Sequence, residues 1–152
     1  MKIEEIIKSE NSLSIEKRTV LNIMFTHHIV SDKFNELLKI YELSTEQFNV
    51  LRILRGQKGK PANMSIIQER MIAKTSNTTR LVDKLLLKGL VFREVCEHNR
   101  RKMEVTITEK GLDVLKILDP EVIKHEKAFA SNMTSDELEN LNQLLEKFRT
   151  IK

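Results

Sequence analysis

Apolar residues recur at helical spacing over most of the chain and alternate at strand spacing in one short interval. The longest helical pattern predicts a helix from about Ser14 to Glu42, with an apolar stripe wider than one packing contact needs. At 1.5 Å per residue this helix would be about 40 Å long. A capping box at 44–47 then predicts a second helix to about Arg55, which Gly56 closes.

The middle of the chain predicts two short helices that are joined by a tight turn. A capping box at Ser65 opens the first of them, over 65–71. After the turn, Thr75 or Ser76 is expected to cap an amphipathic helix that stops at Gly89, where a left-handed residue is suited to end it. Two such helices in succession form a helix-turn-helix.

Directly after that helix the spacing changes to the alternation of a strand. Apolar and polar residues alternate over 91–96 and again over 103–107, on either side of a polar stretch at 97–102. This pattern predicts a β-hairpin with a charged tip. Thr108 is expected to cap the following helix, and Gly111 in its first turn permits close packing.

The C-terminal part of the chain predicts two further helices. The first runs over 112–129, and Asp119-Pro120 within it predicts a kink or a restart. A capping box at Thr134 opens the last helix. The chain is therefore expected to be mostly α with a small β-hairpin (α+β): a winged helix-turn-helix with helical segments at both ends.

Charge is segregated along the sequence, although the net charge is only +4. Residues 57–102 hold eleven Lys and Arg against four Asp and Glu, a balance of +7, whereas the remaining residues carry a balance of −3. Solubility alone does not need such segregation. A basic middle between acidic ends indicates a local binding surface for a polyanion such as double-stranded DNA.

Other compartments and function classes are disfavoured. The single cysteine, Cys96, cannot form an intrachain disulfide, which fits a reducing cytoplasm. The N-terminal segment lacks the apolar region of a signal peptide, and no apolar run is long enough to span a membrane. No phosphate-binding glycine loop, paired carboxylates or nucleophile–base pattern is present, so an enzyme is not expected.

The order of the elements and several of their residues resemble the MarR family of bacterial transcription regulators. That family's wing signature is Asp-x-Arg, five residues, then Leu-Thr-x-x-Gly. Here Asn99 stands in place of the Asp and Ile107 in place of the Leu, with the spacing intact. The resemblance covers essentially the whole chain, and the matching residues are 79–85, 88–91, Arg93, 99–101 and 107–111.

The resemblance implies a single MarR-like chain over 1–152, with a winged helix over 44–110 and a helical dimerisation part over 1–42 and 112–152. It implies a homodimer whose two winged helices face a pseudo-palindromic operator. The apolar stripes at both ends support this independently, because a compact winged helix does not need them; the alternative is that they pack back on their own chain. The expected dimerisation residues are Ile3, Ile6, Ile7, Leu138, Leu141, Leu144, Leu145 and Phe148.

The expected DNA contacts gather at the start of the second helix of the helix-turn-helix. Hydroxyls, an amide and unpaired backbone N–H groups there can meet base edges and phosphates. Arg80 could instead pair with Asp83. Gln68 and Lys74 are expected to contact phosphates. The full set outside the hairpin is Gln68, Lys74, Ser76, Asn77, Thr78, Thr79, Arg80 and Lys84.

The hairpin tip adds Asn99, Arg100, Arg101 and Lys102 to the expected DNA contacts. Arginines there suit a DNA minor groove, whose negative potential attracts them. The alternative is a solvated charged turn, but no acidic residue lies between 98 and 103. In the family the wing Asp is expected to brace the neighbouring Arg. Asn99 brings no charge, so we expect Arg101 to be less rigidly held.

The resemblance further implies a pocket for a small aromatic or phenolic ligand between the dimer helices and the winged helix. The candidate residues are His27, His28, Phe34 and Tyr41, with a role in the core or an interface as the alternative. No dense set of metal ligands with zinc spacing is present, so neither a metal nor a cofactor is expected. Cys96 lies beside the acidic Glu97, which disfavours a reactive thiolate and oxidant sensing.

These observations favour a sequence-specific DNA-binding transcription regulator, expected to be a dimeric repressor that a ligand releases. The alternative is a dimeric helical protein-interaction module with weak, non-specific DNA binding. The basic segment over 57–102 favours the regulator.

Overall fold

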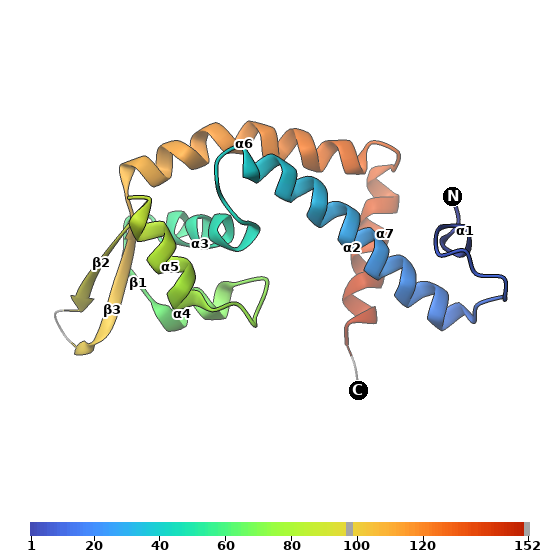
Figure 1. Ribbon diagram of the computed structural model, residues 1–152, viewed down its shortest axis with the longest axis horizontal. Helices are drawn as coiled ribbons and strands as arrows, with labels where there is room; N and C mark the ends of the chain where they lie inside the picture. The colour runs from blue at the N-terminus through green and yellow to red at the C-terminus, as the bar shows by residue number, and fades with distance from the viewer. Residues whose placement is uncertain (97–98, 151–152) are drawn as a thin grey trace. The chain divides into compact units, whose positions relative to one another are not determined.

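The computed structural model describes residues 1–96 and 99–150, and it confirms a mostly helical fold with a small antiparallel sheet (Figure 1). The chain divides into two compact units, 1–45 and 46–152. The first unit holds α1 (Ile3–Ile6) and α2 (Ile15–Lys39). Ser14 caps α2 by accepting a hydrogen bond from the Lys17 backbone, so this helix begins where the sequence predicts.

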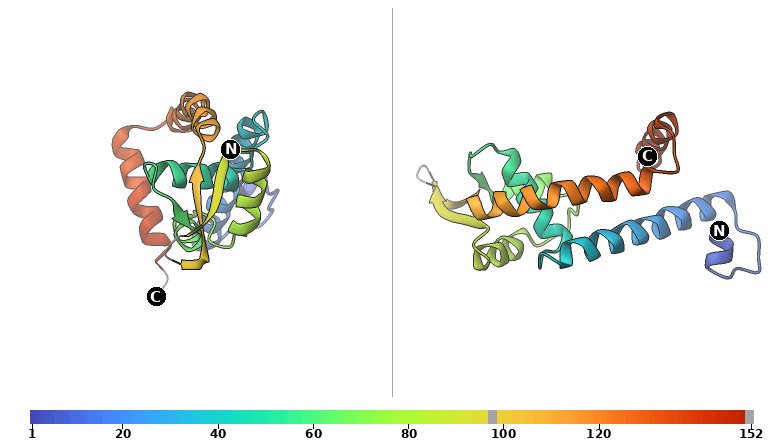
Figure 2. Two further views of the ribbon diagram at one scale, coloured as in Figure 1. Left: turned by 90° about the vertical axis from the view of Figure 1, so that its left-hand side faces the viewer. Right: turned by 90° about the horizontal axis from the view of Figure 1, so that it is seen from above.

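The second unit contains the helix-turn-helix, the hairpin and the C-terminal helices. The sheet lies near the N-terminal end of helix α6 (Glu109–Ala130), and α7 (Ser135–Phe148) follows its C-terminal end (Figures 1 and 2). In chain order the elements are α3 (Thr45–Gly56), β1 (Ala62–Asn63), α4 (Met64–Arg70), α5 (Thr78–Leu87), β2 (Val91–Cys96), β3 (Asn99–Ile107), α6 (Glu109–Ala130) and α7 (Ser135–Phe148).

The sheet has the strand order β1-β3-β2, with both pairings antiparallel. The hairpin of β2 and β3 confirms the predicted wing, with Val91 opposite Ile107 and Arg93 opposite Val105. β3 begins at Asn99, within the stretch predicted to be the polar tip. The strand β1 was not predicted, because a strand of two residues has no alternation to detect.

The predicted N-caps of α4 and α5 are wrong by one or two residues. Asn63, rather than Ser65, caps α4 by accepting a hydrogen bond from the Ile66 backbone N–H at 3.0 Å. Asn77, rather than Thr75 or Ser76, caps α5 through the Arg80 backbone N–H, also at 3.0 Å. Asn, Ser and Thr cap helices about equally well, so packing decides among neighbouring candidates.

The C-terminal helices follow the predicted caps, but one of the two alternatives predicted at Pro120, the restart, is not found. α6 continues through Pro120, so a restart at this residue is wrong, although Pro120 cannot donate to a backbone carbonyl one turn earlier. Thr134 and Glu137 form the predicted capping box of α7. The hydrogen bonds from the Thr134 backbone and hydroxyl to the Glu137 carboxylate lower the pKa of that carboxyl below its ordinary value.

The end of α5, the start of β2 and the start of α6 meet at one junction. Gly89 has a φ of 68° and ends α5, with hydrogen bonds from Gly89 N to Leu86 O (2.9 Å) and from Leu90 N to Leu85 O (3.0 Å). The Thr108 hydroxyl donates to the Gly89 carbonyl oxygen at 2.8 Å and accepts from the Gly111 N–H at 3.1 Å. The predicted roles of Gly89 and Thr108 are thus confirmed.

The core of the second unit is built from α3, α4, α5, the sheet and the first half of α6. Its fully buried side chains include Leu51, Leu54, Ile67, Leu85, Val105, Leu115 and Leu118. By contrast, α7 buries none of its residues. Among the helices within the described ranges, none is both long and apolar enough to cross a membrane.

Gly111→Ala is expected to destabilise the second unit. A Cβ at this position would overlap the Leu90 carbonyl oxygen and lie 2.7 Å from Ile107 Cγ1, so the junction would have to open. We expect the free energy of unfolding in urea to fall by about 1–3 kcal/mol. The matched control is Gly56→Ala, where a Cβ meets nothing within 4 Å. An equal effect of both substitutions would contradict close packing at Gly111.

Candidate nucleic-acid interface

A hollow of about 610 Å³ lies between α4 and the residues that lead into α5. Four of its side chains carry hydroxyls and two carry amides, so hydrogen-bonding groups lie beside apolar atoms in its lining. Base edges and phosphates are recognised by groups of this kind. The lining residues are Met64, Ser65, Gln68, Glu69, Ser76, Asn77, Thr78 and Thr79.

Four of the residues predicted to contact DNA have partners inside the protein. The Gln68 amide nitrogen donates to the Lys74 carbonyl oxygen at 2.5 Å, and the Gln68 amide oxygen accepts from the Thr78 hydroxyl. The Lys74 ammonium donates to the Glu69 carbonyl oxygen, at the end of α4. Asn77 uses its side-chain oxygen to cap α5. These four side chains therefore hold the turn between α4 and α5.

The other predicted residues of this region present their side chains outward. Thr79, Arg80 and Lys84 are exposed on α5, and Ser76 is half-buried in the turn before it. Within the described ranges, no hydrogen bond or ion pair engages the side chains of these four residues. They are available to a ligand that approaches the start of α5.

Asp83 is the acidic residue of α5, and it is paired with the wing strand β2. Arg93 Nη1 lies 2.6 Å from Asp83 Oδ1, so the alternative pairing of Asp83 with Arg80 is not found. The pair has two consequences. It ties α5 to β2, and it offsets a negative charge that would otherwise oppose a polyanion on this face.

The wing tip is only partly described. Lys102 lies exposed on β3, whereas Glu97 and His98 fall outside the described residues. The backbone of Asn99, Arg100 and Arg101 belongs to β3, but their side chains lie outside what the structure describes.

The residues predicted to bind a small ligand lie on or just after α2. His27 Nδ1 lies 3.5 Å from the Ser31 hydroxyl, and His28 Nε2 lies 3.2 Å from Asp32 Oδ2. Both histidines are exposed, whereas Phe34 and Tyr41 are half-buried. The two histidines thus make separate contacts along their own helix and do not converge on one point.

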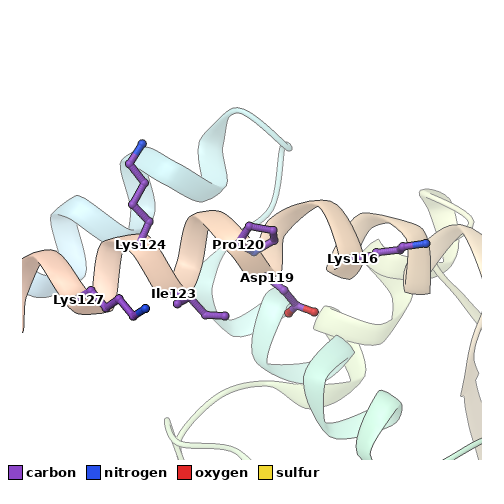
Figure 3. Close-up of a pocket in the computed structure, with 6 residues that line it drawn as sticks. All are labelled: Lys116, Asp119, Pro120, Ile123, Lys124 and Lys127. Carbon is purple, nitrogen blue, oxygen red and sulfur yellow. The ribbon is translucent and has the colours of Figure 1, made fainter.

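A second hollow, of about 570 Å³, lies along α6 (Figure 3). Pro120 and Ile123 form its apolar part, and Lys116, Lys124 and Lys127 surround it. Asp119 points toward α3, where its carboxylate receives two hydrogen bonds from Arg55, at 2.6 and 3.0 Å. With this carboxylate paired, the hollow combines an apolar surface with positive charge.

The residues predicted to form the dimer interface differ in exposure. Ile3 is buried within the chain, at 3% exposed, and Ile6 is half-buried. On α7 the predicted stripe is largely open to solvent: Leu141 is 41% exposed, Leu144 55% and Phe148 49%. α7 therefore presents an apolar face that the described part of its own chain does not cover.

Two contacts that hold the helix-turn-helix in place were not anticipated from the sequence. The Asn49 side chain on α3 accepts a hydrogen bond from the Ile72 backbone N–H at 3.0 Å, which anchors the turn. The Lys110 ammonium donates to the Lys88 carbonyl oxygen at 2.8 Å, at the end of α5. Both join residues more than twenty positions apart, so no local pattern could have indicated them.

Comparison with known proteins places this geometry in a family. The model of the MarR family matches residues 43–103. The uncharacterized HTH-type transcriptional regulator YfiV of Bacillus subtilis is 31% identical over 113 residues, which cover 72% of this chain and 68% of the relative. A MarR transcription factor from Planctomyces limnophilus is 31% identical, with a TM-score of 0.70 over 90% of this chain and 98% of that one.

A more distant structure shares the fold. BpsR of Bordetella bronchiseptica, whose DNA binding is regulated by 6-hydroxynicotinic acid, has a TM-score of 0.80 at 16% identity, covering 93% of this chain and all of its own. The family match, the two relatives above 30% identity and the winged helix agree with the resemblance seen in the sequence. This chain belongs to the MarR family of DNA-binding transcriptional regulators.

Proposed function

We propose that this protein represses transcription by binding a pseudo-palindromic operator as a homodimer, and that a small aromatic ligand releases it. The observation that carries the DNA part is the surface at the start of α5. There the hydroxyls of Ser76 and Thr79 and the cationic side chains of Arg80 and Lys84 are available, while Arg93 pairs with the one acidic residue of the helix. Such a surface suits base edges and phosphates in a major groove.

The proposed contacts divide by chemistry. Ser76, Thr79 and Arg80 read bases or neighbouring phosphates, and Lys84 and Lys102 contact phosphates. The wing contacts the adjacent minor groove through Asn99, Arg100 and Arg101. Gln68, Lys74, Asn77 and Thr78 contribute mainly by holding the turn, because their side chains already have partners inside the protein.

A second copy of this chain is the proposed partner of α7. A helix without a buried residue gains little stability from its own chain, and most helical stability in proteins comes from packing of an apolar face. Pairing two copies would cover the stripe of Leu141, Leu144, Leu145 and Phe148. A two-fold dimer also suits inverted half-sites about one helical turn apart, roughly 34–36 Å.

The proposed regulation by a ligand is supported by a protein of similar fold and by the lining of the α6 hollow. The DNA binding of BpsR responds to 6-hydroxynicotinic acid, an aromatic acid. On this chain, the α6 hollow joins an apolar surface to three lysines, which fits a small aromatic anion. The residues His27, His28, Phe34 and Tyr41 are the other candidate site. A ligand that changes the separation of the two α5 helices would weaken operator binding.

Selection from a random DNA library is expected to enrich an inverted repeat with half-sites about one helical turn apart. Arg80→Ala and Arg101→Ala should each weaken binding to the selected sequence by about 1–3 kcal/mol at fixed salt, because each removes a charged DNA contact. The control is Arg149→Ala, an exposed arginine at the end of α7. Failure to enrich any motif would favour the protein-interaction module.

Leu144→Glu is expected to convert the dimer to monomers, because it places a charge in the proposed apolar interface. Analytical ultracentrifugation should show the change in mass, and binding to the full inverted repeat should weaken more than binding to a half-site. Gln143→Glu on the polar face of the same helix serves as the control. A variant that stays dimeric would remove α7 from the interface.

Hydroxylated aromatic acids and simple phenols are expected to weaken operator binding, with at least one compound shifting the dissociation constant by about five- to 150-fold. Fluorescence anisotropy with labelled operator measures this shift. Loss of the response in Lys124→Ala would assign it to the α6 hollow, and loss in His27→Ala would assign it to α2. Unchanged affinity with every compound would reject the regulatory part.

A further inference from the structure

Gln68 connects two elements of the helix-turn-helix through both atoms of its amide. It lies on α4, and its nitrogen donates to the Lys74 carbonyl oxygen in the turn at 2.5 Å. Its oxygen accepts a hydrogen bond from the hydroxyl of Thr78, the first residue of α5. We refer to these three residues, Gln68, Lys74 and Thr78, as the Gln68 bridge.

The burial of Thr78 makes this bridge more than a surface contact. Thr78 is only 6% exposed, and in the described part of the chain it and Gln47 are the two buried polar residues. The Thr78–Gln68 hydrogen bond is part-buried, and a hydroxyl that loses its partner in such a place costs free energy, so this bond stabilises the packed position of α5. The position of the first turn of α5 is thereby coupled to the Gln68 side chain.

The other contacts near α4 and α5 restrict the orientation of the first turn of α5 less than the Gln68 bridge does. Ile67 and Met71, like Val82 and Leu85 of α5, are buried in the apolar core, and apolar burial has no preferred direction. The Asn49 hydrogen bond to the Ile72 N–H fixes the start of the turn, but it does not reach α5. A hydrogen bond requires a defined distance and angle, so the Gln68 bridge sets the orientation of the α5 N-terminus.

We propose that Gln68 is a positioning residue that confers sequence discrimination, by holding Ser76, Thr79 and Arg80 in register with the bases, and that it does not itself contact DNA. This inference rests on the proposed operator binding. A recognition surface that is loose by about 1 Å loses specific contacts. The overall attraction to DNA should survive, because it depends on the number of phosphates that Lys and Arg neutralise, and Gln68 is uncharged.

The test compares affinity for the selected operator with affinity for random DNA at fixed salt. Gln68→Met keeps the length of the side chain but loses both hydrogen bonds, and Thr78→Val keeps its shape but loses the hydroxyl. Each variant is expected to bind the operator roughly tenfold more weakly, the size of one lost specific contact. Affinity for random DNA and its salt dependence should stay within about twofold of the wild type.

The double variant makes the test independent of any defect in folding. Replacing both partners of the Thr78–Gln68 hydrogen bond by apolar groups of similar shape is close to neutral for stability. The Lys74 carbonyl oxygen lies at an exposed site, where water can replace the lost donor, so Gln68→Met with Thr78→Val should fold like the wild type. If the two residues act through one bridge, the loss in the double variant stays at roughly tenfold and does not multiply to roughly a hundredfold. Thr78→Ser, which keeps the hydroxyl, should retain most of the discrimination.

Three results would overturn the inference. Equal weakening on operator and random DNA in Gln68→Met would make Gln68 a phosphate contact. Lost discrimination in Gln68→Met but not in Thr78→Val would make it a direct base contact. Unchanged discrimination in both variants would leave the bridge without a role in recognition.

The matched control is Gln143→Met. Gln143 lies on α7, away from α4 and α5, where its amide donates to Glu139 at 3.2 Å. This variant should discriminate between operator and random DNA as the wild type does. A wild-type protein without any preference for an operator would instead refute the proposed function. The two failures are therefore distinguishable.

Discussion

The close approach of α6 to the end of α5 is the constraint on which the winged helix depends. Gly111 lies against the Leu90 carbonyl oxygen and the Ile107 side chain, where a Cβ cannot fit. This contact lets Thr108 bond to Gly89 and lets Lys110 bond to Lys88. The C-terminal end of α5, both wing strands and the start of α6 therefore form one closely packed junction, which positions the base of the wing relative to α5.

The N-terminal end of α5 is held differently, through polar side chains in place of close packing. Asn77 caps the helix, Gln68 bridges Lys74 and Thr78, and Asn49 anchors the turn. Polar residues of one short segment thus divide into two groups. The side chains of one group form hydrogen bonds with backbone groups or with the Thr78 hydroxyl. The other group, Ser76 with Thr79 and Arg80, remains available at the surface. A structure is needed to separate them, because both groups have the same residue types.

Charge and apolar surface are distributed over different parts of this chain. The segment 57–102 is basic and includes the whole helix-turn-helix, whereas α7 is amphipathic and buries nothing. Pairing of Asp83 with Arg93 offsets an opposing charge on the α5 face and at the same time ties α5 to β2. One ion pair therefore contributes to both the electrostatics and the geometry of the candidate interface.

The local pattern of the sequence was enough to predict the elements with strong periodicity or a clear stop. The long α2, the α5 stop at Gly89, the hairpin, the Thr108 cap and the close packing at Gly111 all follow from spacing and from residues with special backbone preferences. The MarR family could be recognised for the same reason, since its signature is an ordered set of such residues. These features depend on neighbours within a few positions of the chain.

Only the tertiary structure decided which of several equivalent polar residues performs each task. The two-residue strand β1 depends on its pairing with the distant strand β3. The caps at Asn63 and Asn77 and the continuous helix through Pro120 could not be distinguished from their alternatives by residue type alone. The same holds for Gln68, which the sequence placed among the phosphate contacts and which the fold turns toward Thr78. A hydrogen-bonding side chain takes whichever partner the fold brings near, and the identity of that partner is not encoded locally.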